Sequence, residues 1–312
     1  MTQTPTMGNW LSILLLGLIW GGTFMVVSIA LEGYGPLTVA CARTTLGAVA
    51  LTSAALLLRR PFPQARVLRH ILPIGVLNTA LPFALLSWGQ QYVPSAFAGI
   101  SMAALPLFVL PLAHLFGGEP LTARRTIGVG IGFAGALLLI GPGVLRLGTG
   151  MEPLGQLACL AATLSYAAAS ILTRRCPPVD SVMLAALTLV VGAIVLIPAM
   201  LLVEGLPGWT DSRTGTAIVF LGLVPTALAA LLRVTVIRSA GSVFMTLVNY
   251  QVPVWAMLFG ALVLGEVLPF RFFPALALIL AGLLVSQWGA LRRLFTGQAT
   301  GTASESRTAT GK

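Results

Sequence analysis

Charged side chains are scarce in this sequence. Only 8% of its 312 residues are Asp, Glu, Lys or Arg, whereas 57% are hydrophobic, and the mean hydropathy is +0.96. Soluble domains carry about 25% charged residues, so this chain lacks the polar surface that a water-soluble fold needs. The composition therefore predicts an all-α polytopic membrane protein.

Cysteine, histidine and acidic residues are also few. The three cysteines, Cys41, Cys159 and Cys176, lack the spacing of a metal site. The eight acidic residues and two histidines are expected in loops, at helix ends or in the tail, which disfavours a carboxylate proton relay at membrane depth. Because no acid, base and nucleophile converge at one depth, we expect neither an enzyme nor a metal or cofactor.

Long apolar runs are what the sequence has in abundance. Ten of them approach the roughly 20 residues that a helix needs to cross a bilayer. The predicted spans are 10–31, 36–58, 70–90, 94–116, 124–141, 154–173, 180–203, 213–233, 241–264 and 271–291. Residues 1–9 contain no Lys or Arg, which argues against a cleavable signal peptide. Residues 296–312 are polar and low in complexity, and we predict a disordered tail.

Basic residues indicate how the spans are oriented. They gather in arginine pairs between apolar runs, and placing the N-terminus in the cytoplasm puts fourteen of the eighteen on the inner side and three on the outer side. Cytoplasmic loops of membrane proteins are enriched in Lys and Arg. The pattern predicts cytoplasmic N- and C-termini, and it explains the net charge of +10 without a nucleic-acid partner.

The two halves of the chain match each other at an offset of 147 residues. Pro106 aligns with Pro253, and the Gly-Glu pair that contains Glu119 aligns with the pair that contains Glu266. A unit of five spans must be inverted when it is repeated. We therefore expect two inverted five-helix repeats, 10–143 and 152–293, an arrangement that places the substrate site of secondary transporters near the midplane.

A family resemblance rests on the same features. They are "LIWGGTF" in the first span, Pro36 seven positions before Arg43, and two Pro-x12-Glu blocks that end in Gly-Glu-x-Leu. Over roughly residues 10–291 the sequence resembles the EamA-type branch of the drug/metabolite transporter (DMT) superfamily. The resemblance implies a ten-helix inner-membrane carrier, often an exporter of amino acids or other small metabolites.

Polar and aromatic side chains inside the spans are the candidates for substrate contact. They are Trp20, Arg43, Asn78, Trp88, Tyr166, Asn249 and Tyr250. Trp20 and Tyr166 occupy similar places in the first span of each repeat, so we expect them to line a central cavity; the alternative for Trp20 is an aromatic anchor at the membrane interface. Arg43 is the ionisable residue expected well inside a span, about 10 Å from its start. We favour a structural role for it over binding of a substrate carboxylate.

The triplet Asn249, Tyr250 and Gln251 breaks the symmetry of the repeat, because it aligns with Met102, Ala103 and Ala104. Residues present in one half only are better substrate-site candidates than shared ones. We predict that Asn249 and Tyr250 face the cavity and that Gln251 lies in a helix–helix contact. The alternative for Asn249 is that its amide only compensates for the turn broken by Pro253.

Prolines and glutamates are expected at interruptions and ends of helices. Pro82, Pro106 and Pro253 are predicted to break helices and to serve in gating, and Asn78 could bond the backbone that Pro82 disrupts. Glu119 and Glu266 are predicted to cap or neutralise helix ends.

The leading functional interpretation is an exporter of amino acids or similar small metabolites in the inner membrane, working by alternating access. A single deep arginine among amides and aromatic rings suits a zwitterionic or amphipathic solute. Two alternatives stay open: a multidrug or toxic-metabolite exporter, and a membrane assembly component without cargo. The expected partners are a small-molecule substrate and the lipid bilayer, and a homodimer is left open.

Overall fold

The computed structural model describes residues 5–117, 122–141 and 150–296, in which every regular element is helical. In chain order the elements are α1 (Met7–Leu31), α2 (Pro36–Leu57), α3 (Ala65–Gly75), η1 (Val76–Ala80), α4 (Leu81–Gly89), α5 (Ser95–Ala103), α6 (Leu105–Gly117), α7 (Ala123–Ile140), α8 (Glu152–Arg175), α9 (Ser181–Val203), α10 (Ser212–Leu221), η3 (Gly222–Leu228), α11 (Ala229–Ala240), α12 (Ser242–Met245), α13 (Val248–Val263) and α14 (Phe272–Thr296). They form ten helical segments that are long and apolar enough to cross a membrane. The predicted fold class is confirmed.

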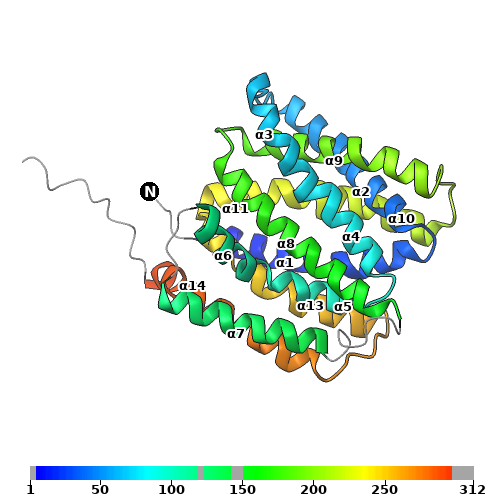
Figure 1. Cartoon of the computed structure of the whole chain (residues 1–312). Helices are drawn as coiled ribbons and strands as arrows, with labels where there is room; N and C mark the ends of the chain where they lie inside the picture. Colours follow the sequence, from blue (N-terminus) through cyan, green and yellow to red (C-terminus); the bar gives the residue numbers. More distant parts are fainter. Residues whose placement is uncertain (1–4, 118–121, 142–149, 297–312) are drawn as a thin grey trace, which may run out of the picture.

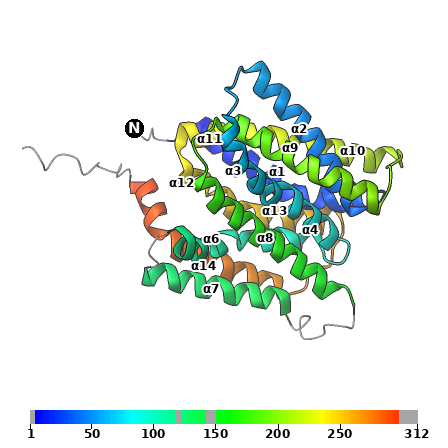
Figure 2. The same ribbon diagram turned by 45° about the horizontal axis from the view of Figure 1, so that its top comes forward.

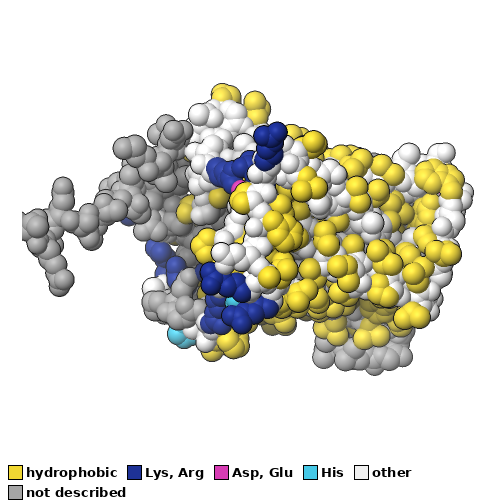
Figure 3. Space-filling model, turned by 90° about the horizontal axis from the view of Figure 1, so that it is seen from above, with side chains coloured by type: hydrophobic (Ala, Val, Ile, Leu, Met, Phe, Trp, Pro, Cys, Tyr) yellow, Lys and Arg dark blue, Asp and Glu magenta, His cyan; other side chains and the backbone are white. Residues whose placement is uncertain are grey.

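The helices run roughly side by side, and the chain enters and leaves the bundle at the same end (Figure 1). We call this the basic end, because it carries Arg60, Arg66, Arg175 and Arg238; Figure 3 shows Lys and Arg side chains gathered towards it on a face that is otherwise largely hydrophobic. The opposite end, which we call the acidic end, carries Glu32, Glu152, Glu204 and Glu266. The charges thus lie mainly at the two ends, as a membrane-spanning bundle requires.

The fifth span of each repeat pairs with the fifth span of the other. Helices α7 and α14 lie against each other at one edge of the bundle (Figure 2). Gly128 and Gly282 permit this approach: a Cβ atom added at Gly282 would lie 2.5 Å from the Gly128 carbonyl oxygen. Small residues let helices approach closely inside a bilayer, where the hydrophobic effect does not drive helices together.

The third span of each repeat contains a π-helical turn. These turns, η1 and η3, interrupt the α-helix in its middle, and they occupy matching places in the two repeats. The Leu81 amide bonds the Val76 oxygen, and the Ala229 amide bonds the Val224 oxygen, five residues back in each case. Pro82 lies two residues after the end of η1. A proline ring clashes with the carbonyl four residues earlier and removes one hydrogen bond. A wider turn relieves that clash.

The fourth and ninth spans are also interrupted, but at places that do not match. The fourth is broken at Ala104, just before Pro106, and the ninth is broken at Thr246 and Leu247. Pro253 lies inside the continuous helix α13, so the prediction that it breaks the helix is wrong. The α-helix survives one missing hydrogen bond there because α1 and α5 pack against α13 from two sides.

A second difference concerns the eighth span, which is longer than expected and reaches Ala240. It includes Arg233, so Arg43 is not the sole arginine well inside a helical segment. The Arg233 side chain is exposed, whereas Arg43 is buried. The two arginines therefore differ in environment.

Candidate functional site

The two π-helical turns each lie against helices of the opposite repeat, η1 against α8 and α9 and η3 against α1 and α2. A π turn shifts the register of backbone hydrogen bonds and leaves carbonyl oxygens without an intrahelical partner. Inside a bilayer these oxygens need a donor from the protein. The first helix of each repeat supplies it to the other repeat: Trp20 Nε1 donates to the Pro225 oxygen at 3.2 Å, and Ser165 Oγ donates to the Leu77 oxygen at 2.8 Å.

Each turn also carries a threonine at the same place, Thr79 in η1 and Thr226 in η3. The Thr226 hydroxyl donates to the Leu221 oxygen, and the Thr79 hydroxyl donates to the oxygens of Gly75 and Thr188. Both threonines pack against a glycine of the opposite repeat, Thr226 against Gly47 and Thr79 against Gly192. The contact is therefore nearly symmetric.

The charge of Arg43 breaks that symmetry. Its Nη2 donates to Thr226 Oγ1 at 3.3 Å, and its guanidinium carbon lies 4.0 Å from the centre of the Phe83 ring. Arg43 lies four residues before Gly47. In the second repeat, the residue four positions before the matching Gly192 is Thr188. One half of the contact thus holds a buried cation, and the other half holds a neutral side chain.

Tyr166 lies between the two largest apolar clusters and packs against both. The residue before it, Ser165, bonds the Leu77 oxygen of η1. Asn78 is half-buried in η1, next to the Leu77 carbonyl that Ser165 binds. The structure therefore brings Trp20, Arg43, Asn78 and Tyr166 to the two π-helical turns.

The polar triplet on α13 is divided between two helix faces. Gln251 packs against Gly17 of α1, and its Oε1 is buried without a hydrogen-bond partner among the described residues. Asn249 is half-buried in the first turn, on the face whose later residue Ala256 packs against Gly99 of α5. The buried Tyr250 hydroxyl likewise has no partner within the described part of the chain. A cavity-facing role for Asn249 and Tyr250 stays a prediction.

Trp88 lies farther along the chain, near the end of α4 that points to the acidic end of the bundle. Its ring contacts Tyr92 in an edge-on arrangement, with 5.1 Å between ring centroids. The next residue, Gly89, packs against α8 at Gly155 and Cys159. Trp88 is thus about ten residues, or 15 Å of helix, beyond Asn78, and the structure does not bring it to the π-helical turns.

Two glutamates join the repeats at the acidic end. Glu204 accepts hydrogen bonds from the amides of Leu37 and Thr38, both at 2.8 Å, and from the Thr38 hydroxyl at 2.7 Å. Glu266 accepts the amides of Ser95 and Ala96 at 2.7 and 3.2 Å. Each carboxylate therefore caps the N-terminus of a helix in the other repeat, where the helix dipole favours negative charge. Glu119 lies outside the described residues.

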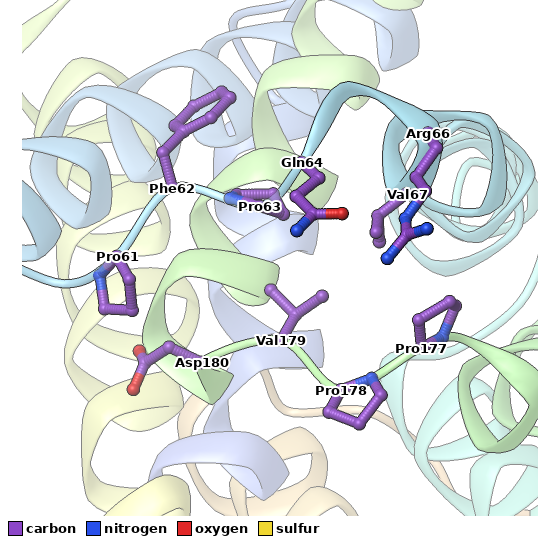
Figure 4. Close-up of a pocket in the computed structure, with 10 residues that line it drawn as sticks. All are labelled: Pro61, Phe62, Pro63, Gln64, Arg66, Val67, Pro177, Pro178, Val179 and Asp180. Atoms are coloured by element: carbon purple, nitrogen blue, oxygen red, sulfur yellow. The ribbon is translucent and has the colours of Figure 1, made fainter.

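The basic end has a surface pocket of about 300 Å³. It lies between the α2–α3 and α8–α9 connections, and Figure 4 shows Pro61, Pro63, Pro177 and Pro178 along its walls. Asp180 lies at its rim, caps α9, and binds Arg238 at 3.0 Å and Arg60 at 3.7 Å. This pocket is remote from the π-helical turns.

Asp180 is held ionised at this end. Partial burial alone would raise the pKa of its carboxyl, but the amides of Met183 and Val182 and the guanidinium groups of Arg238 and Arg60 outweigh it, so the pKa is lowered. In the described part of the chain, no group of three or more His, Cys, Asp or Glu residues is placed to hold a metal ion.

Several of these contacts could have been found in the sequence. Residues 75–81 read GVLNTAL and residues 222–228 read GLVPTAL, so the Gly-x3-Thr-Ala-Leu pattern repeats at the same offset of 147. This match marks Thr79 and Thr226. Ser165 and Glu204 carry no comparable pattern, because their partners lie in the other repeat, far away in the sequence.

Replacing Trp20 with phenylalanine should destabilise the protein by about 1–3 kcal/mol, because the Pro225 oxygen would stay buried without a donor. Ser165→Ala should have a similar effect on the Leu77 oxygen. The measurement is thermal unfolding of the purified protein in detergent. Ser170→Ala is the matched control, since within the described ranges Ser170 bonds only the Ala167 oxygen of its own helix. Equal melting of Ser165→Ala and Ser170→Ala would contradict the assigned role of the inter-repeat bonds.

The chain is similar to a known protein family and to individual membrane transporters. A family model described as the EamA-like transporter family matches residues 8–141 and again residues 153–288. The inner membrane transporter YedA of Escherichia coli (strain K12) is 30% identical over 81% of this chain and 82% of its own length. A probable terminal-alkyne amino-acid exporter of Streptantibioticus cattleyicolor is 28% identical over 88% of this chain and 91% of its own.

Solved structures contain the same fold. One crystal structure, 21% identical in sequence, matches 94% of this chain and the whole of its own chain with a TM-score of 0.63. At this level of identity the likeness concerns the fold alone.

Proposed function

The chain belongs to the EamA-like transporter family, and from this premise we propose that it is a secondary carrier that exports amino acids or similar small metabolites. It works in the inner membrane by alternating access, with cargo bound near the midplane between the repeats. The similarity to a probable amino-acid exporter supports this substrate class.

One observation carries the proposal above the others: each repeat binds the π-helical turn of the other. Trp20 of the first repeat holds the turn around Pro225, and Ser165 of the second repeat holds the turn around Leu77. Interrupted helices at the repeat interface are where transporters place substrate, and π-helical turns occur often at functional sites. A solute bound here contacts both repeats, so it can favour one relative position of them over another.

The polar contacts at the two ends agree with alternating access. At the acidic end, Glu204 and Glu266 each accept backbone amides of the other repeat. At the basic end, the Arg60–Asp180 pair and a bond from Ser239 to Asn9 also join the repeats. We propose that the contacts of Glu204 and Glu266 close the acidic end in this state. By the positive-inside rule we propose that this end faces outwards and that both termini are cytoplasmic.

Transport by purified protein in liposomes tests this function directly. We expect at least one labelled amino acid to exchange saturably, at a rate above that of protein-free liposomes. The described carboxylates lie at the two ends of the bundle, so we expect exchange to continue without a pH gradient. Flux that stops when the gradient collapses would contradict that second expectation.

The runner-up is export of drugs or toxic metabolites, favoured by the rings of Trp20, Phe83 and Tyr166 near the two turns. Aromatic walls select weakly among apolar cations and other amphipathic compounds. The same liposomes, loaded with a lipophilic cation such as tetraphenylphosphonium, separate the two readings. Flux of the cation without flux of any amino acid favours the drug exporter. If no compound moves, the chain is a membrane component without cargo.

A further inference from the structure

Arg43 holds a buried positive charge at the contact between the repeats. Its side chain is 5% exposed, one hydrogen bond leads from Nη2 to Thr226, and the buried Nε has no partner among the described residues. A guanidinium group has five N–H donors. Most of this capacity is unused, although a buried arginine needs a counter-charge or hydration to be tolerated inside a membrane.

The described carboxylates are all engaged elsewhere. Glu204 and Glu266 cap α2 and α5, Asp180 and Asp211 cap α9 and α10, and Glu32 and Glu152 pair with Arg213 and Arg271. All six lie at the ends of the bundle. Within the described ranges, the protein therefore supplies no anion to Arg43.

Packing does not require the charge. Gly192 of the second repeat packs against Thr79 just as Gly47 of the first repeat packs against Thr226. The residue four positions before Gly192 is Thr188, whereas the residue four positions before Gly47 is Arg43. The Thr188 oxygen accepts a hydrogen bond from Thr79 there, and the turn keeps its shape. The sequence alone favoured a structural role for Arg43. The contact between Gly192 and Thr79, however, shows that this glycine–threonine packing forms without an arginine.

We propose that Arg43 binds a carboxylate group of the transported solute. Guanidinium and carboxylate groups match in geometry and form two parallel charge-assisted hydrogen bonds. Thr226 accepts a hydrogen bond from Nη2, and the guanidinium carbon lies 4.0 Å from the centre of the Phe83 ring, so the Nε donor, which has no partner among the described residues, is left for the ligand. One positive charge matches a solute with a single carboxylate. The rings of Phe83 and Tyr166 suit a solute whose remaining part is apolar or aromatic.

This inference extends the proposed function by naming the group of the cargo that the carrier recognises. The bound carboxylate would bridge α2 of the first repeat and, through Thr226, the π-helical turn of the second. Binding would therefore stabilise one arrangement of the two repeats, which is what coupling of cargo to alternating access requires.

A binding experiment tests the proposal without transport. The probes are sodium phenylacetate and phenylacetamide, which have the same body but differ in the carboxylate; sodium chloride is added with the amide to equalise ionic strength. Thermal unfolding is measured for the wild-type protein, Arg43→Gln and Arg43→Lys. We expect phenylacetate near saturation to raise the wild-type Tm by a few degrees, with no rise from phenylacetamide and none in Arg43→Gln.

The outcomes are distinct. An equal rise in wild type and Arg43→Gln, an equal rise with acid and amide, or no rise in wild type overturns the proposal. If Arg43→Gln does not fold, Arg43→Lys decides: it keeps the charge but not the fork-shaped donor set, so we expect a smaller response to phenylacetate. A full response in Arg43→Lys also overturns the proposed paired hydrogen bonds.

Transport then separates the two proposals. In liposomes, we expect the flux ratio of an accepted amino acid to its carboxamide to fall at least about tenfold in Arg43→Gln, since hydrogen bonds to charged groups are worth this much or more. An unchanged ratio contradicts carboxylate binding while transport itself stands. A rise in Tm that is specific to the carboxylate, without flux of any compound, supports the carboxylate site at Arg43 and contradicts the proposed transport function.

Discussion

Replacing Gly282 with alanine should destabilise the folded protein by about 2–3 kcal/mol, although the change adds one methyl group. The new Cβ would lie 2.5 Å from the Gly128 oxygen and 2.5 Å from the Gly132 nitrogen. These neighbours are backbone atoms, so no side chain can rotate away. Helices α7 and α14 would have to separate, and the contact between the fifth spans of the two repeats would loosen along its length.

Thermal unfolding in detergent measures this effect, and we expect Tm to fall by roughly 4–10 °C. Gly128→Ala should act similarly, since its Cβ would lie 2.6 Å from the Gly282 oxygen. Gly130→Ala is the matched control on the same helix, because nothing lies within 4 Å of its Cβ; alanine there should be neutral or slightly stabilising. Wild-type melting of Gly282→Ala would show that the two helices are not in backbone contact.

Replacing Glu204 with alanine should open the acidic end of the carrier. The change removes three hydrogen bonds that a carboxylate of the second repeat accepts from the start of α2 in the first. Hydrogen bonds to charged groups contribute about 1.5–3 kcal/mol each in favourable cases. A net loss of only 1–2 kcal/mol from the closed state changes its population ratio by a factor of about 5–30.

The native Cys41 reports this opening. It lies on α2, one turn beyond Thr38, and is buried. In a background with Cys159 and Cys176 replaced by serine, we expect a membrane-impermeant maleimide to label Cys41 at least about fivefold faster in Glu204→Ala. Glu32→Gln is the control at the same end. Its pair with Arg213 is solvent-exposed, with side chains 48% and 64% accessible, so labelling should change less than about threefold. Equal labelling in both variants would reject Glu204 as a gate.

Much of the fold could be read from local chemistry. The ten spans followed from apolar length, and the two repeats followed from the shared prolines and Gly-Glu pairs, because both signals lie within short stretches of sequence. A π-helical turn lies just before Pro82 in the third span. Pro253 did not interrupt its helix, because a single missing hydrogen bond is tolerated where α1 and α5 pack tightly on either side.

The candidate site was only partly foreseeable. Trp20, Arg43, Asn78 and Tyr166 were selected by their residue types, since polar, charged or large aromatic side chains stand out inside an apolar span. Ser165 and Glu204 were not selected, because neither carries a pattern that marks it, and the repeat match that marks Thr226 does not show that Arg43 is its partner. Each acquires its role from a residue in the opposite repeat, and inversion brings together segments 88 to 183 positions apart.

The sequence by itself determined that this chain crosses a membrane ten times as two inverted repeats, and it indicated the family to which the chain belongs. The physical reason is that the bilayer acts on each segment separately: a span must be apolar and helical whatever surrounds it. The tertiary structure decided which carbonyls of the π-helical turns meet Trp20 and Ser165, which helix Glu204 caps, and that Arg43 bonds Thr226 of the opposite repeat. Those pairings depend on how the repeats pack against each other, and no single segment encodes them.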